Sequence, residues 1–413
     1  MKIKRSTVRI KPQVTRVLLR PFPLSDDRVQ KVIRRVSGLD ANATSVAIED
    51  LRNKFAHRHR DVAGFWQSQF AKRTAGISAA QSLSAAQQLL VGAHLAMEYS
   101  LESAALFNPS IVWHPDQNGV PAGRKRFVIS LRATGEGHIS SLVFLDGIAD
   151  SAGNITIGER SRHTETPEIS PTADGYGAAF SPEIPLSGRV IFPQVPEESN
   201  GIEDARFVQW QQPGEPPQYF ATYTAYDGHR IRSRLLETRD FLNFSSRTLH
   251  GAAVQNKNLA LFPRKINGKY AMLSRQDNEN NYIMFSDDLY CWETKALLNE
   301  PELSWEFTQL GNCGSPIETD AGWLVITHGV GAMRQYAISA MLLDRDAPQK
   351  IIGRLPQPLI APDESEREGY VPNVVYSCGS IVFGEQLIVP YAQSDSSSSF
   401  ATVNLAELIH EMS

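Results

Sequence analysis

The chain is poor in cysteine and has no long apolar run. Its 413 residues include only Cys291, Cys313 and Cys378, which are far apart and form no C-x-x-C pair. An odd number of widely spaced cysteines argues against a disulfide framework and favours a reducing compartment, so we expect a cytoplasmic protein. No segment reaches the roughly 18 apolar residues of a membrane span, and no apolar run follows the basic first residues as in a secretory signal. We therefore expect no membrane partner and no secretion.

An excess of positive charge is also absent. With 41 basic and 45 acidic residues, the formal net charge is −4. Nucleic-acid binding needs a basic face, so this balance gives no reason to expect a nucleic-acid partner. The sequence has no P-loop, no dinucleotide-binding fingerprint and no zinc-ligand spacing. We expect neither a metal site nor an organic cofactor.

The first hundred residues have helical periodicity. Residues 25–38 place four β-branched residues at helical spacing, with Ser25 as a suitable N-cap and Gly38 as a stop. Residues 43–70 predict a second helix or a broken pair, and residues 82–107, rich in strong helix formers, predict another helix. The expected first domain is a mainly helical N-terminal extension over residues 1–106.

After Asn108, short apolar runs alternate with turn residues. Five stretches share one arrangement, a strand, a polar or glycine-rich loop and a second strand, and they begin at residues 125, 218, 269, 322 and 385. The last four begin roughly 50 to 65 residues apart, as do propeller blades of four strands each. The longer first gap contains a loop-rich insertion over residues 150–182. We expect an all-β fold, a five-bladed β-propeller over residues 107–413; a pair of β-sandwiches is the alternative, which the repeated hairpin disfavours.

The loops of equivalent hairpins lie together at one end of a propeller's central channel. In this chain those loops carry Arg132, Tyr226, Asp227, Arg275, Asp277, His328 and Asp395. Solvated loops are polar in any case, but they need no arginine or histidine for that purpose. The pattern therefore predicts a polar, ionisable site at one mouth of the channel.

The stretch SNGIEDARFVQW, residues 199–210, places two acids and an arginine at the start of an apolar strand. Acids are poor strand formers, and a buried carboxylate is costly unless it is paired. On an unbroken strand, Asp204 and Arg206 share one face with Ile202, and Glu203 takes the other face. One acid can then point into the channel while the other is held in structure. A channel carboxylate suits protonation of a glycosidic oxygen, with an Asp204–Arg206 ion pair as the alternative.

Two basic residues at the same mouth indicate an anionic second substrate. Arg275 and His328 suit an oxyanion such as phosphate, because arginine binds phosphate in a bidentate manner and histidine adds a donor. Structural roles stay open for both, since Arg275 can pair with Asp277 and His328 can be a turn residue. If water were the nucleophile, an inverting enzyme would need a second carboxylate. Candidates for that carboxylate are Asp395, Glu366 and Glu368.

Nine motifs occur in order between residues 107 and 379: FNPS, LRATGEGHIS, GIEDAR, TYTAYDG, LFPRKINGKYAMLSR, FSDDLYCWE, GSPIETDAGWLVITHGV, LLDRDAP and GYVPNVVYSCG. Together they resemble glycoside hydrolase family 130, the β-mannoside phosphorylases and related mannosidases, over roughly residues 107–400. The resemblance implies a five-bladed propeller, in agreement with the repeat. One departure is Ala205, where the family usually has proline, so a backbone restraint is lost beside the acid.

The resemblance also implies roles for single residues. Asp204 is similar to the family's catalytic acid, which protonates the glycosidic oxygen through the 3-hydroxyl of the mannose. Four residues match positions that hold this mannose, namely Arg132, Asn256, Lys257 and Asp395. The expected substrate-binding set is completed by Asn108, Arg206, Tyr226 and Asp227. Positions that bind phosphate in the phosphorylases correspond to Arg275, His328 and Tyr336.

The expected function is therefore inverting, reversible phosphorolysis of a β-mannoside. The products are α-mannose 1-phosphate and a shortened acceptor, and inorganic phosphate is the co-substrate. Hydrolases of the family lack part of the basic set that this chain keeps. An inverting β-mannosidase that uses water, with Glu366 or Glu368 as base, is the first alternative, and a propeller that binds mannosides without cleaving them is the second. The helical extension can shape the acceptor side or form an interface between identical copies.

Overall fold

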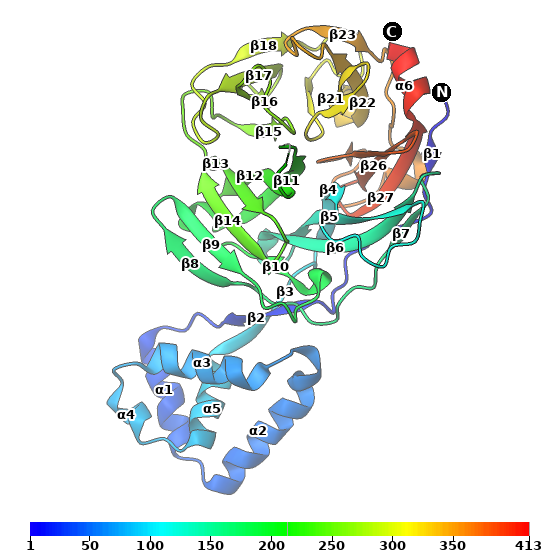
Figure 1. Cartoon of the computed structure of the whole chain (residues 1–413). Coiled ribbons are helices and arrows are strands. Elements are labelled where there is room, and N and C mark those ends of the chain that lie inside the picture. Colours follow the sequence, from blue (N-terminus) through cyan, green and yellow to red (C-terminus); the bar gives the residue numbers. More distant parts are fainter. Residues whose placement is uncertain (213, 413) are drawn as a thin grey trace. The chain divides into compact units, whose positions relative to one another are not determined.

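The computed structural model describes residues 1–212 and 214–412, which form two compact units (Figure 1). We call Met1–Gln13, Glu102–Arg160 and Thr166–Ser413 the β unit, and Val14–Leu101 with Ser161–Glu165 the helical unit. The first 13 residues thus belong to the β unit, whereas the sequence pattern placed all of residues 1–106 in a helical extension. Of the described residues, none forms a helix both long and apolar enough to cross a membrane.

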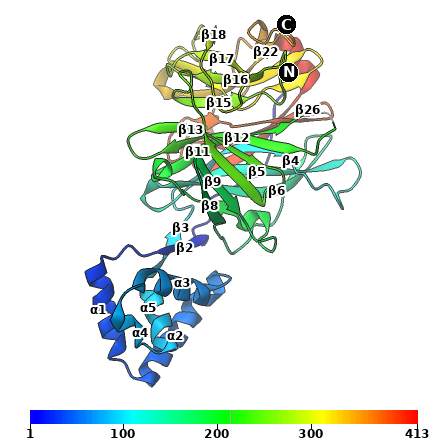
Figure 2. The same cartoon turned by 60° about the vertical axis from the view of Figure 1, so that its left-hand side comes forward.

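The helical unit is built from short helices and a two-stranded ribbon (Figure 2). The helices are α1 (Asp26–Ser37), α2 (Ala41–Phe55), α3 (Val62–Thr74), α4 (Ser78–Gln81) and α5 (Ala85–His94). The ribbon pairs β2 (Val17–Pro21) with β3 (Ala96–Ser100) in antiparallel register. Val29, Ile33 and Val36 of α1 share a buried core with Leu90 and Val91 of α5. The apolar stripe of each helix therefore determines which face it buries.

The predictions for this unit are confirmed for its first helices. Ser25 and Gly38 flank α1, and residues 43–70 form the broken pair of α2 and α3. The helix predicted over residues 82–107 is wrong beyond His94, because Ala96–Ser100 pairs with β2 as a strand. Cross-strand pairing outweighs helix propensity in this segment.

The largest sheet of the β unit consists of two antiparallel parts. One part has β4 (Ala105–Trp113), β5 (Arg124–Thr134), β6 (Ser140–Asp150), β7 (Ile155–Ile157) and β10 (Val190–Ile191). The other has β11 (Gly201–Trp210), β12 (Gln218–Tyr226), β13 (Ile231–Thr238), β14 (Asn243–Thr248), β9 (Gly175–Ala179) and β8 (Glu168–Thr172). A single parallel pair, Gly201 with Ser140, joins the two parts. A Cβ at Gly201, where φ is 143°, would lie 2.8 Å from the Ser140 nitrogen, so this approach requires glycine.

Three further sheets belong to the β unit. One has β15 (Lys257–Leu261), β16 (Tyr270–Arg275), β17 (Asn281–Ser286) and β18 (Ala296–Asn299). The next has β19 (Gln309–Asn312), β20 (Ile317–Thr319), β21 (Gly322–Val330), β22 (Tyr336–Leu343) and β23 (Ile351–Arg354). The last has β24 (Val375–Tyr376), β25 (Ile381–Phe383), β26 (Gln386–Gln393), β27 (Ser397–Asn404) and β1 (Lys4–Arg5), and helix α6 (Leu405–Met412) follows it in the chain.

The five hairpins predicted from the sequence are all present, as β5–β6, β12–β13, β16–β17, β21–β22 and β26–β27. A strand that precedes each hairpin pairs with its first strand; these five inner strands are β4, β11, β15, β19 and β24. The protein is therefore mostly β, and its β unit is built by repetition of one supersecondary element.

Two segments of the β unit depart from the sequence pattern. The stretch over residues 150–182, predicted to be loop-rich, contains β7, β8 and β9, and β9 pairs with β14. The proline in β8 and the glycines in β9 prevented their prediction as strands, because both residue types are depleted in strands. At the other departure, β1 pairs with β27, Lys4 opposite Thr402, although about 390 residues separate the two strands.

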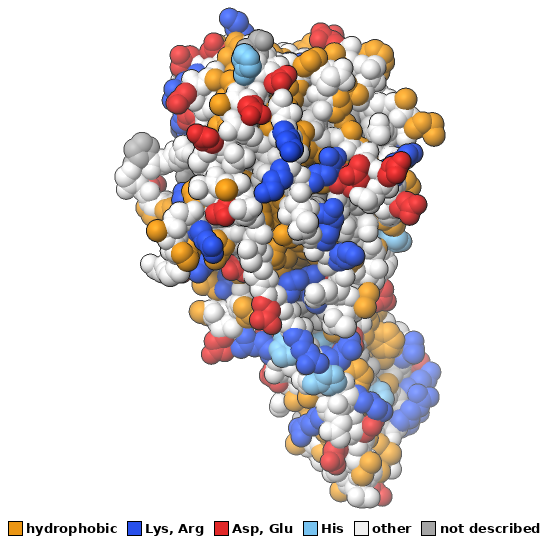
Figure 3. Space-filling model, turned by 90° about the vertical axis from the view of Figure 1, so that its right-hand side faces the viewer, with side chains coloured by type: hydrophobic (Ala, Val, Ile, Leu, Met, Phe, Trp, Pro, Cys, Tyr) orange, Lys and Arg blue, Asp and Glu red, His pale blue; other side chains and the backbone are white. Residues whose placement is uncertain are grey.

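On the face drawn in Figure 3, acidic and basic side chains both occur on the surface.

Candidate active site

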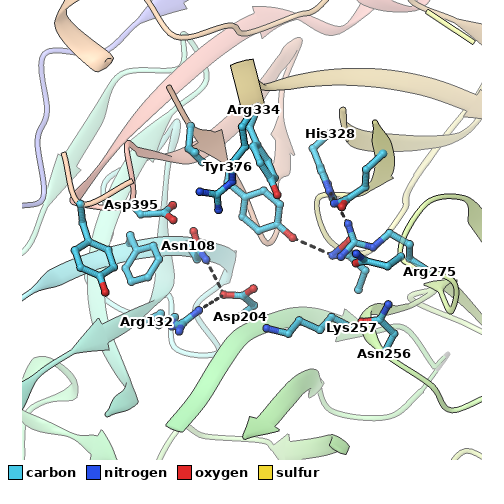
Figure 4. Close-up of a pocket in the computed structure, with 17 residues that line it drawn as sticks. Asn108, Arg132, Asp204, Asn256, Lys257, Arg275, His328, Arg334, Tyr376 and Asp395 are labelled. Atoms are coloured by element: carbon cyan, nitrogen blue, oxygen red, sulfur yellow. Dashed lines mark hydrogen bonds and ion pairs between the residues drawn. The ribbon is translucent and has the colours of Figure 1, made fainter. Parts of the chain in front are cut away.

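A cavity of about 360 Å³ lies in the β unit where inner strands and hairpin loops converge (Figure 4). Its lining is largely polar and ionisable. The lining residues are Phe107, Asn108, Arg132, Asp204, Asn256, Lys257, Asn258, Arg275, Asn278, Gln309, His328, Arg334, Tyr336, Tyr370, Val374, Tyr376 and Asp395. Nine of the twelve residues that the sequence nominated line this cavity, all but Arg206, Tyr226 and Asp227.

Asp204 reaches the cavity through a β-bulge. On β11, Glu203 pairs with Thr224 and Arg206 with Thr222, so two residues oppose one on β12. Asp204 lies in this bulge with φ of 53°, a left-handed conformation that aspartate tolerates better than most residues. The bulge turns the carboxylate toward the cavity.

The same bulge overturns the expectation that Ile202, Asp204 and Arg206 share one face. Ile202 and Ala205 instead pack together in one hydrophobic cluster, whereas Glu203 lies with the basic residues of the site. The extra residue in the bulge shifts the alternation of side chains by one position. A period-2 reading of GIEDAR could not foresee this shift.

Two other inner strands also contain a β-bulge. β4 has a register shift between Phe107 and Ser110, and β15 has one between Lys257 and Ala260. Asn108 and Asn258 lie in these bulges with φ of 48° and 71°. Seven of the thirteen non-glycine residues with positive φ line the cavity, at Asn108, Asp204, Asn256, Asn258, Asn278, Arg334 and Asp395. Backbone strain is thus concentrated at this site, as is common where function depends on geometry.

Asp204 is held ionised by its neighbours. Asn108 Nδ2 donates to Asp204 Oδ1 at 2.6 Å, and Arg132 Nη1 lies 3.4 Å from the same oxygen. Burial alone would raise the pKa of Asp204, but the charges of Arg132, Lys257 and Arg206 and the hydrogen bond from Asn108 outweigh it and lower the pKa. These neighbours therefore keep this carboxylate charged at neutral pH.

Glu203 is the acid that the structure holds in place. It is buried, and its carboxylate accepts from Arg132 Nη2 and Lys257 Nζ, each at 2.7 Å. Glu203 therefore fixes two of the basic groups beside Asp204 without lining the cavity itself. The adjacent acids of GIEDAR have the divided roles that the sequence predicted, one directed to the cavity and one to structure.

Asp395 is the second carboxylate of the cavity. It lies in the β26–β27 turn with φ of 49°. Burial, and then the negative charge of Asp204, raise the pKa of Asp395 to about 6 against the opposing charges of Arg132 and Arg334. The cavity therefore holds two carboxyl groups with very different proton affinities.

The other side of the cavity is basic. Arg275, on β16, is 7% exposed, and within the described residues its Nε has no hydrogen-bond partner. It does not pair with Asp277, whose carboxylate instead accepts from Tyr282 and from the backbone of its own turn. A buried arginine without a carboxylate is costly, and an anionic ligand would satisfy it.

His328 supports Arg275. It lies within strand β21 rather than in a turn, and its Nδ1 is 3.2 Å from the Asn312 carbonyl oxygen, which can only accept. Nδ1 therefore carries the proton, and Nε2, 3.4 Å from Arg275 Nη1, is an acceptor. Burial, and then the charges of Arg275 and Arg206, lower the pKa of His328 well below its usual value. Tyr336 stacks on this neutral ring, with centroids 6.0 Å apart.

Arg206, which the sequence placed among the substrate contacts, lies behind the cavity. Within the described residues it forms no ion pair with Asp204. Its Nη1 lies 3.3 Å from both oxygens of Asn312, and its Nη2 donates to the Tyr376 hydroxyl at 2.5 Å. The alternative of an Asp204–Arg206 ion pair is therefore not what the structure contains.

Tyr226 and Asp227 belong to the β12–β13 turn and not to the cavity. Asp227 is half-buried, and its carboxylate accepts from the backbone of His229 and Arg230 at 2.8 and 2.6 Å. The Tyr226 hydroxyl donates to the Gly228 carbonyl at 2.8 Å. Turn residues of this kind satisfy local backbone groups, which the hairpin pattern alone could not distinguish from ligand contacts.

Neither glutamate proposed as a second carboxylate lines the cavity. Glu366 is buried in a network in which Tyr391 and Gln393 donate to it at 2.5 and 2.7 Å. Glu368 is exposed. The sequence also missed cavity residues, chiefly Arg334, Tyr370 and Tyr376. Arg334 lies in the loop between β21 and β22, the hairpin whose first strand contains His328, and the two tyrosines lie in the motif GYVPNVVYSCG, so a signal for each was present.

Comparison with known proteins agrees with this geometry. Residues 183–413 match the model of glycoside hydrolase family 130, described as beta-1,4-mannooligosaccharide phosphorylase. A 1,2-beta-oligomannan phosphorylase of Thermoanaerobacter sp. (strain X514) is 33% identical over 232 residues, which cover 54% of this chain and 75% of that protein.

Solved structures with low sequence identity share the fold. Beta-1,2-mannobiose phosphorylase from Listeria innocua, in complex with beta-1,2-mannobiose, has a TM-score of 0.56 at 20% identity, covering 76% of this chain and 93% of that chain. A protein described among family members that are glycoside hydrolases targeting beta-1,2 mannosidic linkages has a TM-score of 0.55 at 20% identity, covering 74% and 86%. The resemblance seen in the nine motifs is thus confirmed, and the chain belongs to glycoside hydrolase family 130.

Proposed function

We propose that this protein is an inverting phosphorylase of β-mannosides, which forms α-mannose 1-phosphate and a shortened acceptor. The observation that carries the proposal is a single cavity with a carboxylate, Asp204, and a buried arginine, Arg275, that lacks an anionic partner. The first group can protonate a leaving oxygen, and the second can hold phosphate. The activities named for the relatives support the same substrate class.

The chemistry needs one bond formed and one broken. A phosphate oxygen attacks the anomeric carbon from the face opposite the acceptor, and the bond from that carbon to the acceptor oxygen breaks. Asp204 supplies the proton that the acceptor oxygen takes up, through the 3-hydroxyl of the mannose as in the family. The proton that phosphate loses on forming the ester restores the acid, so the cycle is balanced and reversible.

Phosphate binding also explains how Asp204 becomes an acid. In the free pocket, basic neighbours keep its carboxylate ionised. A phosphate dianion at Arg275 offsets part of this positive charge, which raises the pKa of Asp204 toward the pH of the solution. Asp204 is therefore protonated only when phosphate, the nucleophile, is bound.

The sugar contacts of the proposal are Asn108, Arg132, Asn256, Lys257 and Asp395, all of which line the cavity. Asn108 and Arg132 contact Asp204, whereas Asn256 lies nearer to Arg275 (Figure 4). Arg275, His328 and Tyr336 form the phosphate side, with His328 acting through Arg275. No organic cofactor or metal takes part in this chemistry. We also propose that the β unit is a five-bladed propeller whose inner strands are β4, β11, β15, β19 and β24. A cytoplasmic location, supported by three free cysteines, belongs to the same proposal.

Hydrolysis is the second candidate, and one observation favours it. Asp395 is a cavity carboxylate near Asp204, so it could activate water in an inverting mechanism. Arg275 speaks against it, because it forms no ion pair within the described residues and a water nucleophile would leave that buried charge without an anion. A role for the helical unit in contacts between identical copies stays a proposal.

The test is turnover of β-1,2-, β-1,3- and β-1,4-linked mannobioses with and without inorganic phosphate, followed by NMR. Mannose 1-phosphate formed only with phosphate, as the α anomer, is the expected result. Free mannose formed equally in both conditions would overturn the phosphorylase in favour of the hydrolase. Asp204→Asn serves as the inactive reference, and Asp320→Asn, at an exposed position, as the matched control with full activity.

A further inference from the structure

The hydroxyl oxygen of Tyr376 is held by two donors. This residue ends strand β24 and lines the cavity. Arg206 Nη2 donates to its hydroxyl at 2.5 Å, and Asn258 Nδ2 donates at 2.9 Å. A guanidinium and an amide nitrogen can only donate. Both acceptor positions of the tyrosine oxygen are therefore occupied.

The proton of this hydroxyl then needs an acceptor elsewhere. Within residues 1–212 and 214–412, Tyr376 donates no hydrogen bond. Burial raises the pKa of Tyr376 although the charge of Arg206 opposes it, so the hydroxyl stays protonated at neutral pH. A buried donor without an acceptor is unfavourable by about 1–3 kcal/mol, and the cavity is where an acceptor can bind.

The surroundings of Tyr376 indicate which ligand this acceptor belongs to. Its ring meets that of His328 edge to face, with centroids 4.9 Å apart, and lies 6.4 Å from the ring of Tyr336. Figure 4 shows its hydroxyl directed toward the side of the cavity that contains Arg275. The hydroxyl thus faces the side of Arg275, which forms no ion pair within the described residues.

We propose that the Tyr376 hydroxyl donates a hydrogen bond to the bound phosphate and is a further phosphate contact beside Arg275. Two positioning residues fix the direction of that hydrogen bond, Arg206 and Asn258. Arg206 follows Asp204 by two residues on the bulged strand β11, so one bulge sets both the acid and the phosphate donor. This inference rests on the proposed function and deepens it.

Tyr376→Phe tests the proposal, because it removes the oxygen and keeps the ring. A hydrogen bond to a charged group of this kind corresponds to a change of about 10- to 100-fold. We expect the Kd for inorganic phosphate, measured by calorimetry, and the KM values for phosphate and mannose 1-phosphate to rise by this factor. The KM for the mannoside stays within about twofold. Tyr219→Phe, which removes a hydroxyl bonded to the Trp113 carbonyl, is the matched control.

Unchanged phosphate affinity in Tyr376→Phe, or a rise confined to the KM of the mannoside, would overturn the assignment while leaving phosphorolysis intact. Absence of both phosphate binding and phosphate-dependent turnover in the unmodified protein would overturn the proposed function as well. The two failures are therefore distinguishable.

A second variant, Asn258→Asp, gives a double-mutant cycle with Tyr376→Phe. Asn258→Asp offers the Tyr376 hydroxyl a competing acceptor within the protein, in addition to placing a negative charge near the phosphate. In the Tyr376→Phe background only the added charge has an effect. The rise in the phosphate KM of the double variant should therefore be smaller than the product of the rises in the two single variants. Fully multiplicative effects would contradict the proposal.

Discussion

Asp395→Asn should stabilise the protein more at high pH than at low pH. Asp395 is a mostly buried carboxyl whose pKa is raised to about 6, against 3.8 for the unperturbed group. Because the folded-state pKa lies above the unfolded one, the folded protein binds the extra proton. The contribution of Asp395 to stability is therefore greatest below pH 4, falls as the pH rises from about 4 to 6, and then levels off.

The size of the effect follows from these two values. A shift of about 2 units corresponds to about 3 kcal/mol in total, of which about 1.4 kcal/mol falls between pH 5 and 8. An asparagine of the same shape has no charge to bury, so Asp395→Asn should gain about 1.4 kcal/mol relative to the natural sequence when the pH is raised from 5 to 8. Activity should fall, since the variant changes a proposed sugar contact.

Urea unfolding at pH 5 and pH 8 measures the difference. Asp320→Asn, an exposed residue with the same change of charge, corrects for the net charge of the protein. Equal gains for Asp395→Asn at both pH values, after that correction, would refute the argument that burial and the neighbouring Asp204 raise the proton affinity of Asp395.

Three further predictions concern groups around the cavity and the edge of the last sheet. Glu203→Ala removes the buried carboxylate that pairs with the half-buried Arg132, and we expect a loss of about 3 kcal/mol in urea unfolding; a loss below about 0.5 kcal/mol would show that the pair is dispensable. Gly311→Ala would place a Cβ 2.4 Å from His328 Cε1. It should raise the phosphate KM by about 10- to 100-fold without changing the mannoside KM, whereas equal rises in both would place the damage elsewhere. Removal of residues 1–9 uncovers the edge of β27, and we expect a lower Tm and association at high concentration; a monodisperse protein with unchanged Tm would contradict this.

The repeat of the β unit was readable from the sequence because hairpins have a local signal. An apolar strand, a turn and a second strand lie within about 25 residues, so each unit could be identified without knowing its neighbours. Helix α1 was also predictable from local signals, namely its helical periodicity and the flanking Ser25 and Gly38. They failed at Ala96–Ser100, where pairing with β2 decides the conformation, since a partner about 80 residues away leaves no local trace.

The membership of the cavity was predictable in large part, but its geometry was not. Resemblance to a family supplied Asp204 and Arg275 by position, whereas the bulge at Asp204 depends on backbone strain that residue types do not encode. Tyr226 and Asp227 matched the hairpin pattern, yet they satisfy their own turn. Tyr376 was missed because its role depends on two donors from distant strands, Arg206 and Asn258.

The pairing of β1 with β27 has a consequence for synthesis of the chain. Lys4 is synthesised long before Thr402, its partner on β27. Contacts of such long sequence separation form slowly, because the entropy of closing the loop is lost before the contact compensates it. The last sheet can therefore be completed only after β27 has been synthesised, and until then β1 lacks the strand with which it pairs.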